Sequence, residues 1–181
     1  MKAAIIGAGN MGSAIARGMA KGSIVPATSI TVSNPSQGKL DRLKAAFPAL
    51  QVTRDNRAAA KGADMVILAV KPWLIEPVVK ELGIEADTLV VSVAAGISCG
   101  QLAGYTGNLG QPVFRLIPNT AISEMQSMTL ITGNNTTDEQ RKLMLDIFCE
   151  MGMALWLPEE KMAAATAMTS CGIAYALKYI Q

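Results

Sequence analysis

The strongest constraint on this chain lies near its start, where an apolar run enters a glycine pattern. Residues 3–12 read AAIIGAGNMG, so a strand-like run precedes Gly7, Gly9 and Gly12 in the spacing G-x-G-x-x-G. A helical stretch, Met11–Lys21, follows. Between a strand and a helix this spacing is typical of a dinucleotide site, because the glycines allow a tight turn and let a pyrophosphate approach the helix N-terminus. The first unit of the fold is therefore predicted to bind a dinucleotide.

The rest of the chain alternates between short apolar runs and helical stretches. The predicted strands are Lys2–Ala8, Ser29–Ser33, Leu50–Thr53, Asp64–Val70, Thr88–Ala94, Val113–Ile117, Met128–Thr132 and Ala154–Leu157. Continuous apolar strands are typical of a parallel sheet that is covered on both faces, and helices between them complete that cover. We therefore predict an α/β fold of the doubly wound Rossmann type, with a mainly parallel sheet.

The predicted helices place a boundary late in the chain. After Met11–Lys21 come Gly38–Phe47, Arg57–Lys61 and Trp73–Leu82, and two capping-box patterns, Ser98 with Gln101 and Thr137 with Gln140, predict two further helix starts. The alternation ends near Leu157, and residues 159–181 read as one long helix. We predict a dinucleotide-binding domain over 1–157 and the start of a second, helical region over 158–181.

Composition excludes several classes of function. The net charge is +2 with no basic cluster, which disfavours nucleic acid as a partner. Histidine is absent, which removes imidazole as an acid, a base or a metal ligand, and no metal site is expected. The three cysteines are widely spaced, as in a reduced cytoplasmic protein, and no targeting or membrane-spanning segment is expected.

The acidic residue that an NAD site requires is missing. Such a site holds the ribose 2′-hydroxyl with Asp or Glu about twenty residues beyond the glycines, but the first acidic residue here is Asp41. The second predicted strand instead ends in Ser33-Asn34-Pro35-Ser36, with Lys39 and Arg42 beyond it. Hydroxyls, an amide and cations suit a 2′-phosphate, so we predict NADP(H) in preference to NAD(H).

Three later strand ends carry groups that a ligand could use. Lys71 follows Asp64–Val70, and ligands bind at such carboxyl ends in open sheets. Small residues at 94–96 leave room for a flat ring or serve close packing only, and the sequence leaves both open. Asn119 and Thr120, after another strand, either orient a ligand or cap a loop.

Taken together, these motifs resemble one family. GAGNMG at 7–12, DN at 55–56, AVKP at 69–72, SVAAGI at 92–97 and RLIPNT at 115–120 are similar to the motifs of Δ1-pyrroline-5-carboxylate reductase. AMTSCGIAY at 167–175 resembles the family segment A-L-S-G-S-G-P-A-Y. The resemblance covers the whole chain in order. It implies a Rossmann domain followed by a helical domain that dimerises and completes the active site.

The resemblance also implies roles for individual residues. Those expected to bind the cofactor are Gly7, Gly9, Asn10, Met11, Gly12, Ser33, Asn34, Asn56, Val70, Lys71, Pro72 and Ala95, and those expected to bind the substrate carboxylate are Thr169, Ser170, Cys171 and Gly172. The pattern departs from the family at Ser170, Ile173 and Lys178, which leaves the contact to the imine open. The family's helical domain has further helices, so the chain is expected to be a truncated form that associates, most simply as a homodimer, through its C-terminal helix.

The implied reaction is hydride transfer from NADPH to the C=N bond of Δ1-pyrroline-5-carboxylate, a small imino acid, to give proline. No catalytic residue is assigned, because alignment of the two rings and a protonated imine suffice. A β-hydroxyacid dehydrogenase or another imine reductase is the nearest enzymatic alternative, but Lys178 and Gln181 miss the G-x-x-x-K-x-x-N register of the former. A non-catalytic NADP-binding sensor is the alternative from another class.

Overall fold

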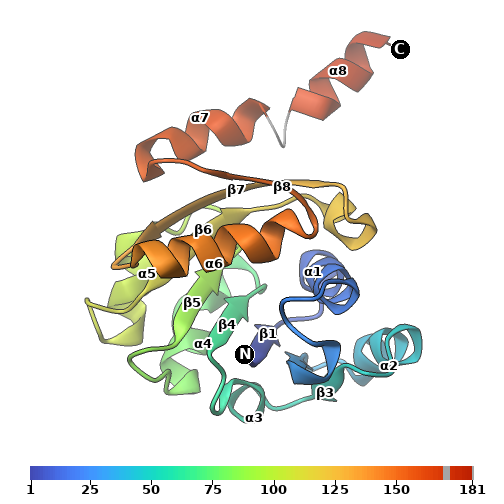
Figure 1. Cartoon of the computed structure of the whole chain (residues 1–181), viewed down its shortest axis with the longest axis vertical. Coiled ribbons are helices and arrows are strands. Elements are labelled where there is room, and N and C mark those ends of the chain that lie inside the picture. The colour runs from blue at the N-terminus through green and yellow to red at the C-terminus, as the bar shows by residue number, and fades with distance from the viewer. Residues whose placement is uncertain (169–171, 181) are drawn as a thin grey trace.

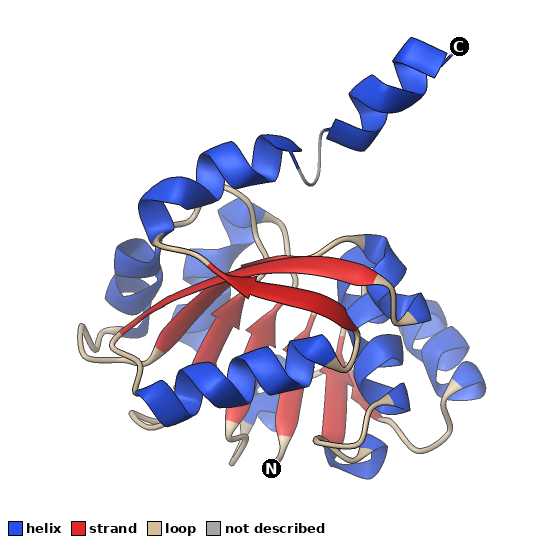
Figure 2. Ribbon diagram, turned by 45° about the horizontal axis from the view of Figure 1, so that its top comes forward, coloured by secondary structure: helices blue, strands red, loops and turns tan. Residues whose placement is uncertain are grey.

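The computed structural model describes residues 1–168 and 172–180 and builds them around one twisted sheet of eight strands (Figures 1 and 2). The strand order is β3-β2-β1-β4-β5-β6-β7-β8. The strands are β1 (Ala3–Ile6), β2 (Ile30–Ser33), β3 (Gln51–Thr53), β4 (Met65–Leu68), β5 (Leu89–Ser92), β6 (Val113–Ile117), β7 (Ser127–Asn134) and β8 (Gly152–Trp156). From β1 the strand numbers rise toward both edges of the sheet, because β1 lies between β2 and β4. A doubly wound sheet binds its ligand at this point.

The predicted sheet is confirmed, with one reversal of direction. Strands β1 to β6 run parallel to one another, β7 is antiparallel to β6, and β8 is parallel to β7. A short connection through the 3-10 turn η2 (Thr120–Glu124) joins β6 to β7, and a connection of that length cannot hold a parallel crossover. The sequence did not predict η2.

Helices cover both faces of the sheet. The helices are α1 (Asn10–Lys21), α2 (Gln37–Ala46), α3 (Asn56–Ala60), α4 (Pro72–Leu82), α5 (Cys99–Thr106) and α6 (Asp138–Cys149). Residues of α1, α2 and α6 join Ala3 and Ile5 in one apolar cluster, whereas those of α3, α4 and α5 join Ala4 and Ile6 in another. Successive strand residues point to opposite faces, which explains why all four residues of β1 are apolar and buried.

Most element boundaries differ from the prediction by one or two residues. Strands β1 and β4 are shorter at both ends than the apolar runs that predicted them, and β7 is longer. Both capping boxes are confirmed, because Ser98 and Thr137 each accept from the backbone N–H of a glutamine three residues on, whose side chain accepts in return. These caps are local interactions, and local sequence therefore predicts them well.

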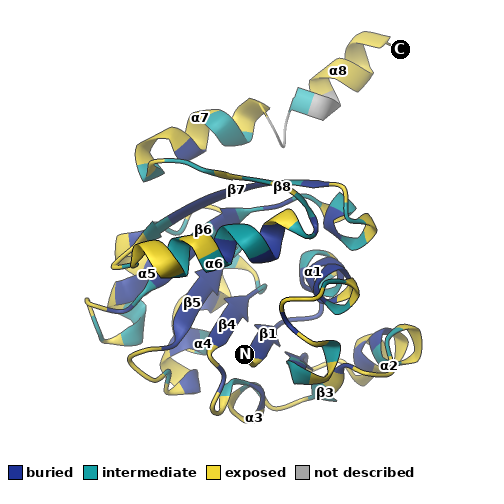
Figure 3. Cartoon of the chain, viewed as in Figure 1, coloured by how far each residue is buried: buried dark blue, intermediate teal, exposed yellow. Residues whose placement is uncertain are grey.

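The single helix predicted over 159–181 is wrong in its first part. The chain forms the 3-10 turn η3 (Glu159–Lys161) and then the short helix α7 (Met162–Thr166), while α8 (Gly172–Ile180) is a separate element. Residues 169–171 lie outside the described residues. Helix α8 extends away from the sheet, and its described side chains are almost entirely exposed (Figure 3).

Candidate functional site

Two glycines of the turn are required by the fold itself. Gly7 has φ +105°, and a Cβ at this position would lie 2.6 Å from the carbonyl oxygen of Ala69. A Cβ on Gly12 would lie 1.9 Å from the carbonyl oxygen of Gly7. At both positions the backbone packs so closely against a neighbouring carbonyl, where α1 meets the ends of β1 and β4, that only glycine fits.

Gly9 is different, because the protein's own packing does not require it. A Cβ built on Gly9 would meet no atom within 4 Å, and its φ of −73° is open to any residue. Gly9 is the N-cap of α1, no side chain caps this end, and the first turn carries no acidic residue. The space before a bare helix N-terminus is thus left clear for an anionic ligand that must approach the backbone.

A second layer of polar groups fixes the shape of the turn. The Asn34 side chain accepts a hydrogen bond from the Ala8 N–H at 3.0 Å and donates to the Ser36 carbonyl at 3.3 Å. The Ser33 hydroxyl donates to Oδ1 of Asn56 at 2.8 Å and is fully buried. This hydrogen bond orients the Asn56 side chain, and the expected contact of Ser33 with the ribose or its phosphate stays a prediction.

A pocket of about 680 Å³ opens in front of this turn, within the usual range of small-molecule sites. It is lined by Gly7, Gly9, Asn10, Met11, Asn34, Pro35, Lys39, Asn56, Ala69, Val70, Lys71, Leu74, Val78 and Val93. Most of the predicted cofactor residues are thereby brought together from separate strand ends. Gly12, Ser33, Pro72 and Ala95 are not in the lining.

The apolar wall of this pocket was not predicted from the sequence. Leu74 and Val78 lie one helical turn apart on α4, and Val93 follows β5. Leu74 is 42% exposed although it is a large apolar residue. The i, i+4 spacing of Leu74 and Val78, shortly after Lys71 at the end of β4, could have indicated this wall. The same spacing is also typical of a helix face that packs on the core.

The charge of the pocket suits an anionic ligand. Lys39 and Lys71 both contribute to the lining, and none of the described lining residues is acidic. Within the described residues 1–168 and 172–180, no group of His, Cys, Asp and Glu side chains could hold a metal ion. Cationic side chains and helix N–H groups are the groups that this pocket offers to an anionic ligand.

The segment predicted to bind the substrate carboxylate is described only at its last residue. Thr169, Ser170 and Cys171 lie outside the described residues, and Gly172 is the first residue of α8.

The sequence left two alternatives open for Asn119, a ligand contact or a loop cap. The structure shows the cap, because the Asn119 side chain accepts from the Ala121 N–H at 3.1 Å at the start of η2.

One partly buried polar cluster connects the start of the C-terminal segment to α5. A Glu159 carboxylate oxygen accepts from the Cys99 N–H at 2.8 Å and lies 3.6 Å from Nη1 of Arg115. Burial, and then the Glu159 charge, raises the pKa of the Cys99 thiol to about 12. The raised pKa favours the protonated thiol of this buried cysteine at neutral pH.

Comparisons with known proteins agree with this geometry. A family model described as NADP oxidoreductase coenzyme F420-dependent matches residues 2–96. The pyrroline-5-carboxylate reductase of Methanosarcina acetivorans is 35% identical over 99% of this chain, and that of Escherichia coli is 33% identical over 99%. This chain spans 67% of the length of each of these two relatives, and between 61% and 65% of several others.

Solved structures give the same result for the fold. A pyrroline-5-carboxylate reductase from Coxiella burnetii superimposes with a TM-score of 0.89 at 32% identity, over 98% of this chain and 67% of the other. The chain belongs to the pyrroline-5-carboxylate reductase family. A Plasmodium falciparum member described with NADP bound superimposes with a TM-score of 0.87 at 26% identity, over 99% of this chain and 66% of that one. As a member of this family of NAD(P)-dependent oxidoreductases, the chain places its glycine turn and pocket where a dinucleotide site is expected.

Proposed function

We propose that this chain provides the cofactor domain of a pyrroline-5-carboxylate reductase, which reduces the C=N bond of Δ1-pyrroline-5-carboxylate to give proline. The observation that carries the proposal is the clear space before the α1 N-terminus at Gly9, which the protein's own packing does not explain. The family relationship supplies the reaction class. Among the described helices, none is long and apolar enough to cross a bilayer.

The residues present fit a dinucleotide. The free N–H groups at the start of α1 would hold the pyrophosphate, and Lys71 at the start of α4 would add a positive charge. Leu74, Val78 and Val93 would exclude water from the bound rings. When bound, the reduced nicotinamide supplies a hydride, which is chemistry that no protein side chain can provide.

The chain itself would orient the two reactants rather than supply a strong base. A protonated imine is already electrophilic at carbon, and its reduction requires one hydride at that carbon while the proton already on nitrogen stays there. This requirement is compatible with a chain that has no histidine. We propose that Thr169, Ser170, Cys171 and Gly172 hold the substrate carboxylate through hydroxyl and backbone N–H groups, as the family motif implies.

We further propose that NADPH binds more tightly than NADH. The support is the charge of the lining, with Lys39 beyond the end of β2 and no acidic residue at the position where an NAD site places one. Free thiols at Cys99 and Cys149 are in keeping with a cytoplasmic location, which we also propose.

We propose that the chain associates with itself through its C-terminal segment. Met168, Tyr175, Leu177, Tyr179 and Ile180 are each more than half exposed, although all are large and apolar or aromatic. Large apolar side chains that are exposed on one segment are typical of an association surface. Light scattering would report a dimer or larger species, whereas a monomer at all concentrations would contradict the proposal.

The function is tested by following NADPH absorbance in the presence of Δ1-pyrroline-5-carboxylate. We expect tight NADPH binding by calorimetry and oxidation of NADPH that depends on this substrate. Oxidation coupled to β-hydroxy acid chemistry alone would instead support the dehydrogenase alternative. Binding of NADPH without turnover of any imine would support a sensor and refute the proposal.

A further inference from the structure

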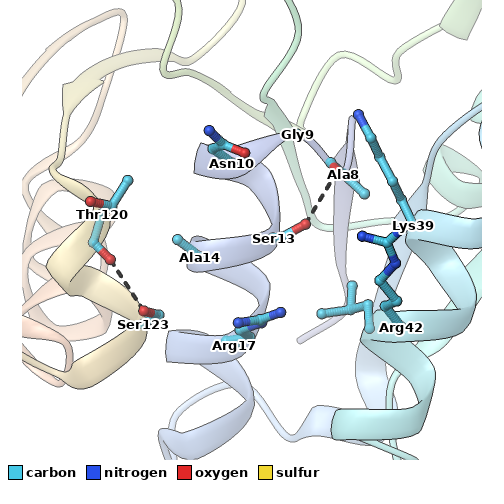
Figure 4. A pocket seen from close by; sticks show the side chains of 11 residues that line it. Ala8, Gly9, Asn10, Ser13, Ala14, Arg17, Lys39, Arg42, Thr120 and Ser123 are labelled. Carbon is cyan, nitrogen blue, oxygen red and sulfur yellow. Dashed lines mark hydrogen bonds between the residues drawn. The ribbon is translucent and has the colours of Figure 1, made fainter.

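The partly buried cluster of Cys99, Arg115 and Glu159 joins three parts of the chain that are distant in the sequence. Cys99 is the first residue of α5, Arg115 lies within β6, and Glu159 is the first residue of η3. Neither Arg115 nor Glu159 is among the described residues that line the dinucleotide pocket or the adjoining groove of about 330 Å³ between α1, α2 and η2, which Figure 4 shows. The pair is therefore not part of the wall of either cavity.

Glu159 caps the N-terminus of α5 from a distant part of the chain. The first N–H groups of a helix have no acceptor within that helix. The Ser98 hydroxyl accepts from the Gln101 N–H locally, whereas the Cys99 N–H donates to Oε1 of Glu159 at 2.8 Å. A carboxylate at this end of a helix also interacts favourably with the helix dipole. The start of α5 is thus connected to the start of the C-terminal segment.

Arg115 holds the same carboxylate from the side of the sheet. Its Nη1 lies 3.6 Å from Oε1 of Glu159, and its side chain is only 16% exposed. Its Nε is buried and has no hydrogen-bond partner among the described residues. A buried ion pair with an unsatisfied donor is often less stable than two apolar side chains of similar volume. Stability alone therefore does not explain an arginine at this position, whereas a role in fixing geometry would.

The pair lies between the two parts of the chain that are proposed to hold the reactants. In the register of β5 and β6, Arg115 lies opposite Ser92, the last residue of β5, after which a loop leads to α5. Val93, the first residue of this β5–α5 loop, lines the dinucleotide pocket. On the other side, Glu159 precedes α7, and the segment predicted to hold the substrate carboxylate begins soon afterwards at Thr169.

We infer that Arg115 and Glu159 are positioning residues for the reduction: the pair holds the start of the C-terminal segment against the β5–α5 loop, so that substrate and cofactor meet at the correct distance. This inference deepens the proposed function and rests on it. The reacting atoms must approach to about 3–3.5 Å, and a displacement of about 1 Å can lower the rate about 100-fold. Two reactants that are held by separate segments need a rigid connection between those segments, and the pair provides one.

The charge of the pair is tested by Glu159→Gln in the 181-residue chain. Glutamine keeps an oxygen that can accept from the Cys99 N–H, but it removes the charge that faces Arg115. We expect kcat for imine reduction to fall about tenfold or more. The Kd for NADPH should stay within about twofold of wild type, because neither residue of the pair lines the dinucleotide pocket.

Glu160→Gln is the matched control for this variant. Glu160 is the neighbouring carboxylate, is exposed, and forms no ion pair with a described residue. This substitution should change neither kcat nor the Kd for NADPH. An unchanged kcat in Glu159→Gln, or an equal loss of kcat in Glu160→Gln, would refute the positioning role.

A double variant separates positioning from stability. Arg115→Met alone leaves the Glu159 carboxylate without its cation, so we expect a lower Tm. Adding Glu159→Leu replaces the ion pair with two apolar side chains, which should recover at least part of that Tm. These side chains cannot accept from the Cys99 N–H, so kcat should stay low although stability recovers. If kcat recovers together with Tm, the pair serves stability only and the inference is wrong.

Hydrogen exchange measured by mass spectrometry reads the connection without relying on activity. Glu159→Leu removes the acceptor of the Cys99 N–H, so exchange should become faster both at the start of α5 and in α7. Exchange that stays as in wild type at both places would contradict the connection. Failure of the proposed function would look different, because the wild-type chain would then reduce no imine while the exchange pattern would still report whether the pair connects the two segments.

Discussion

Replacing Gly9 by alanine should separate cofactor binding from folding, whereas replacing Gly12 should damage the fold. Both glycines belong to one motif, yet their surroundings differ. A Cβ on Gly9 meets no atom within 4 Å, but a Cβ on Gly12 would lie 1.9 Å from a backbone oxygen. The pair therefore tests whether the space before α1 is a ligand site or only a turn.

The effect of each substitution on stability follows from the local geometry. At Gly9 an alanine destabilises the fold because it is disfavoured at the N-cap, but it also stabilises the fold by reducing the entropy of the unfolded chain. Each effect is about 0.5–1 kcal/mol, and the two offset each other. At Gly12 the new Cβ would clash with the backbone carbonyl of Gly7, so no rotamer change relieves it, and we expect a loss of stability of about 3 kcal/mol or more. For a chain of this size that loss lowers Tm by about 6–12 °C.

For Gly9→Ala we expect the opposite pattern, with weaker cofactor binding and little change in stability. A methyl group in the space that a pyrophosphate occupies costs about 1–3 kcal/mol, which corresponds to about 5- to 150-fold weaker binding. Gly9→Ala should therefore show a Tm close to wild type and a clearly raised Kd for NADPH. Calorimetry measures both quantities, and a Gly9→Ala chain that binds NADPH as tightly as wild type would refute the placement of the pyrophosphate at this turn.

Three further outcomes follow from individual side chains. Asn34→Asp should shift preference toward NADH in competing titrations, because a carboxylate at the end of β2 repels a 2′-phosphate and accepts from a 2′-hydroxyl. Burial raises the pKa of Glu150, but hydrogen bonds from the Ser23 hydroxyl and from the backbone N–H groups of Ser23 and Ile24 lower it further, so the net pKa is lowered. Glu150→Gln should therefore reduce Tm near pH 7, and the difference from wild type should vanish as the pH falls below the ordinary pKa of 4.5. Iodoacetamide near pH 8 should alkylate exposed Cys149 and spare Cys99, as read by peptide mass spectrometry, since a pKa of about 12 leaves Cys99 protonated.

Local sequence determined much of the fold, because short-range patterns specify single elements. The uninterrupted apolar residues of β1 and β4 predict strands buried on both faces, and the capping boxes at Ser98 and Thr137 predict where α5 and α6 begin. The spacing of Gly7, Gly9 and Gly12 predicts the turn, since its requirements are met within one strand–turn–helix unit. The domain division at residue 157 stays a prediction.

Only the tertiary structure decided which of these residues face the pocket. Ser33 and Asn34 are adjacent polar residues in the sequence, yet only Asn34 lines the pocket, where it accepts from the Ala8 N–H, while the Ser33 hydroxyl donates to Asn56. Lys39 on α2 and Lys71 at the start of α4 are far apart in the sequence and line one pocket because β1 lies between β2 and β4. Side-chain direction and long-range neighbours depend on packing between elements, and the periodicity of a single element does not encode them.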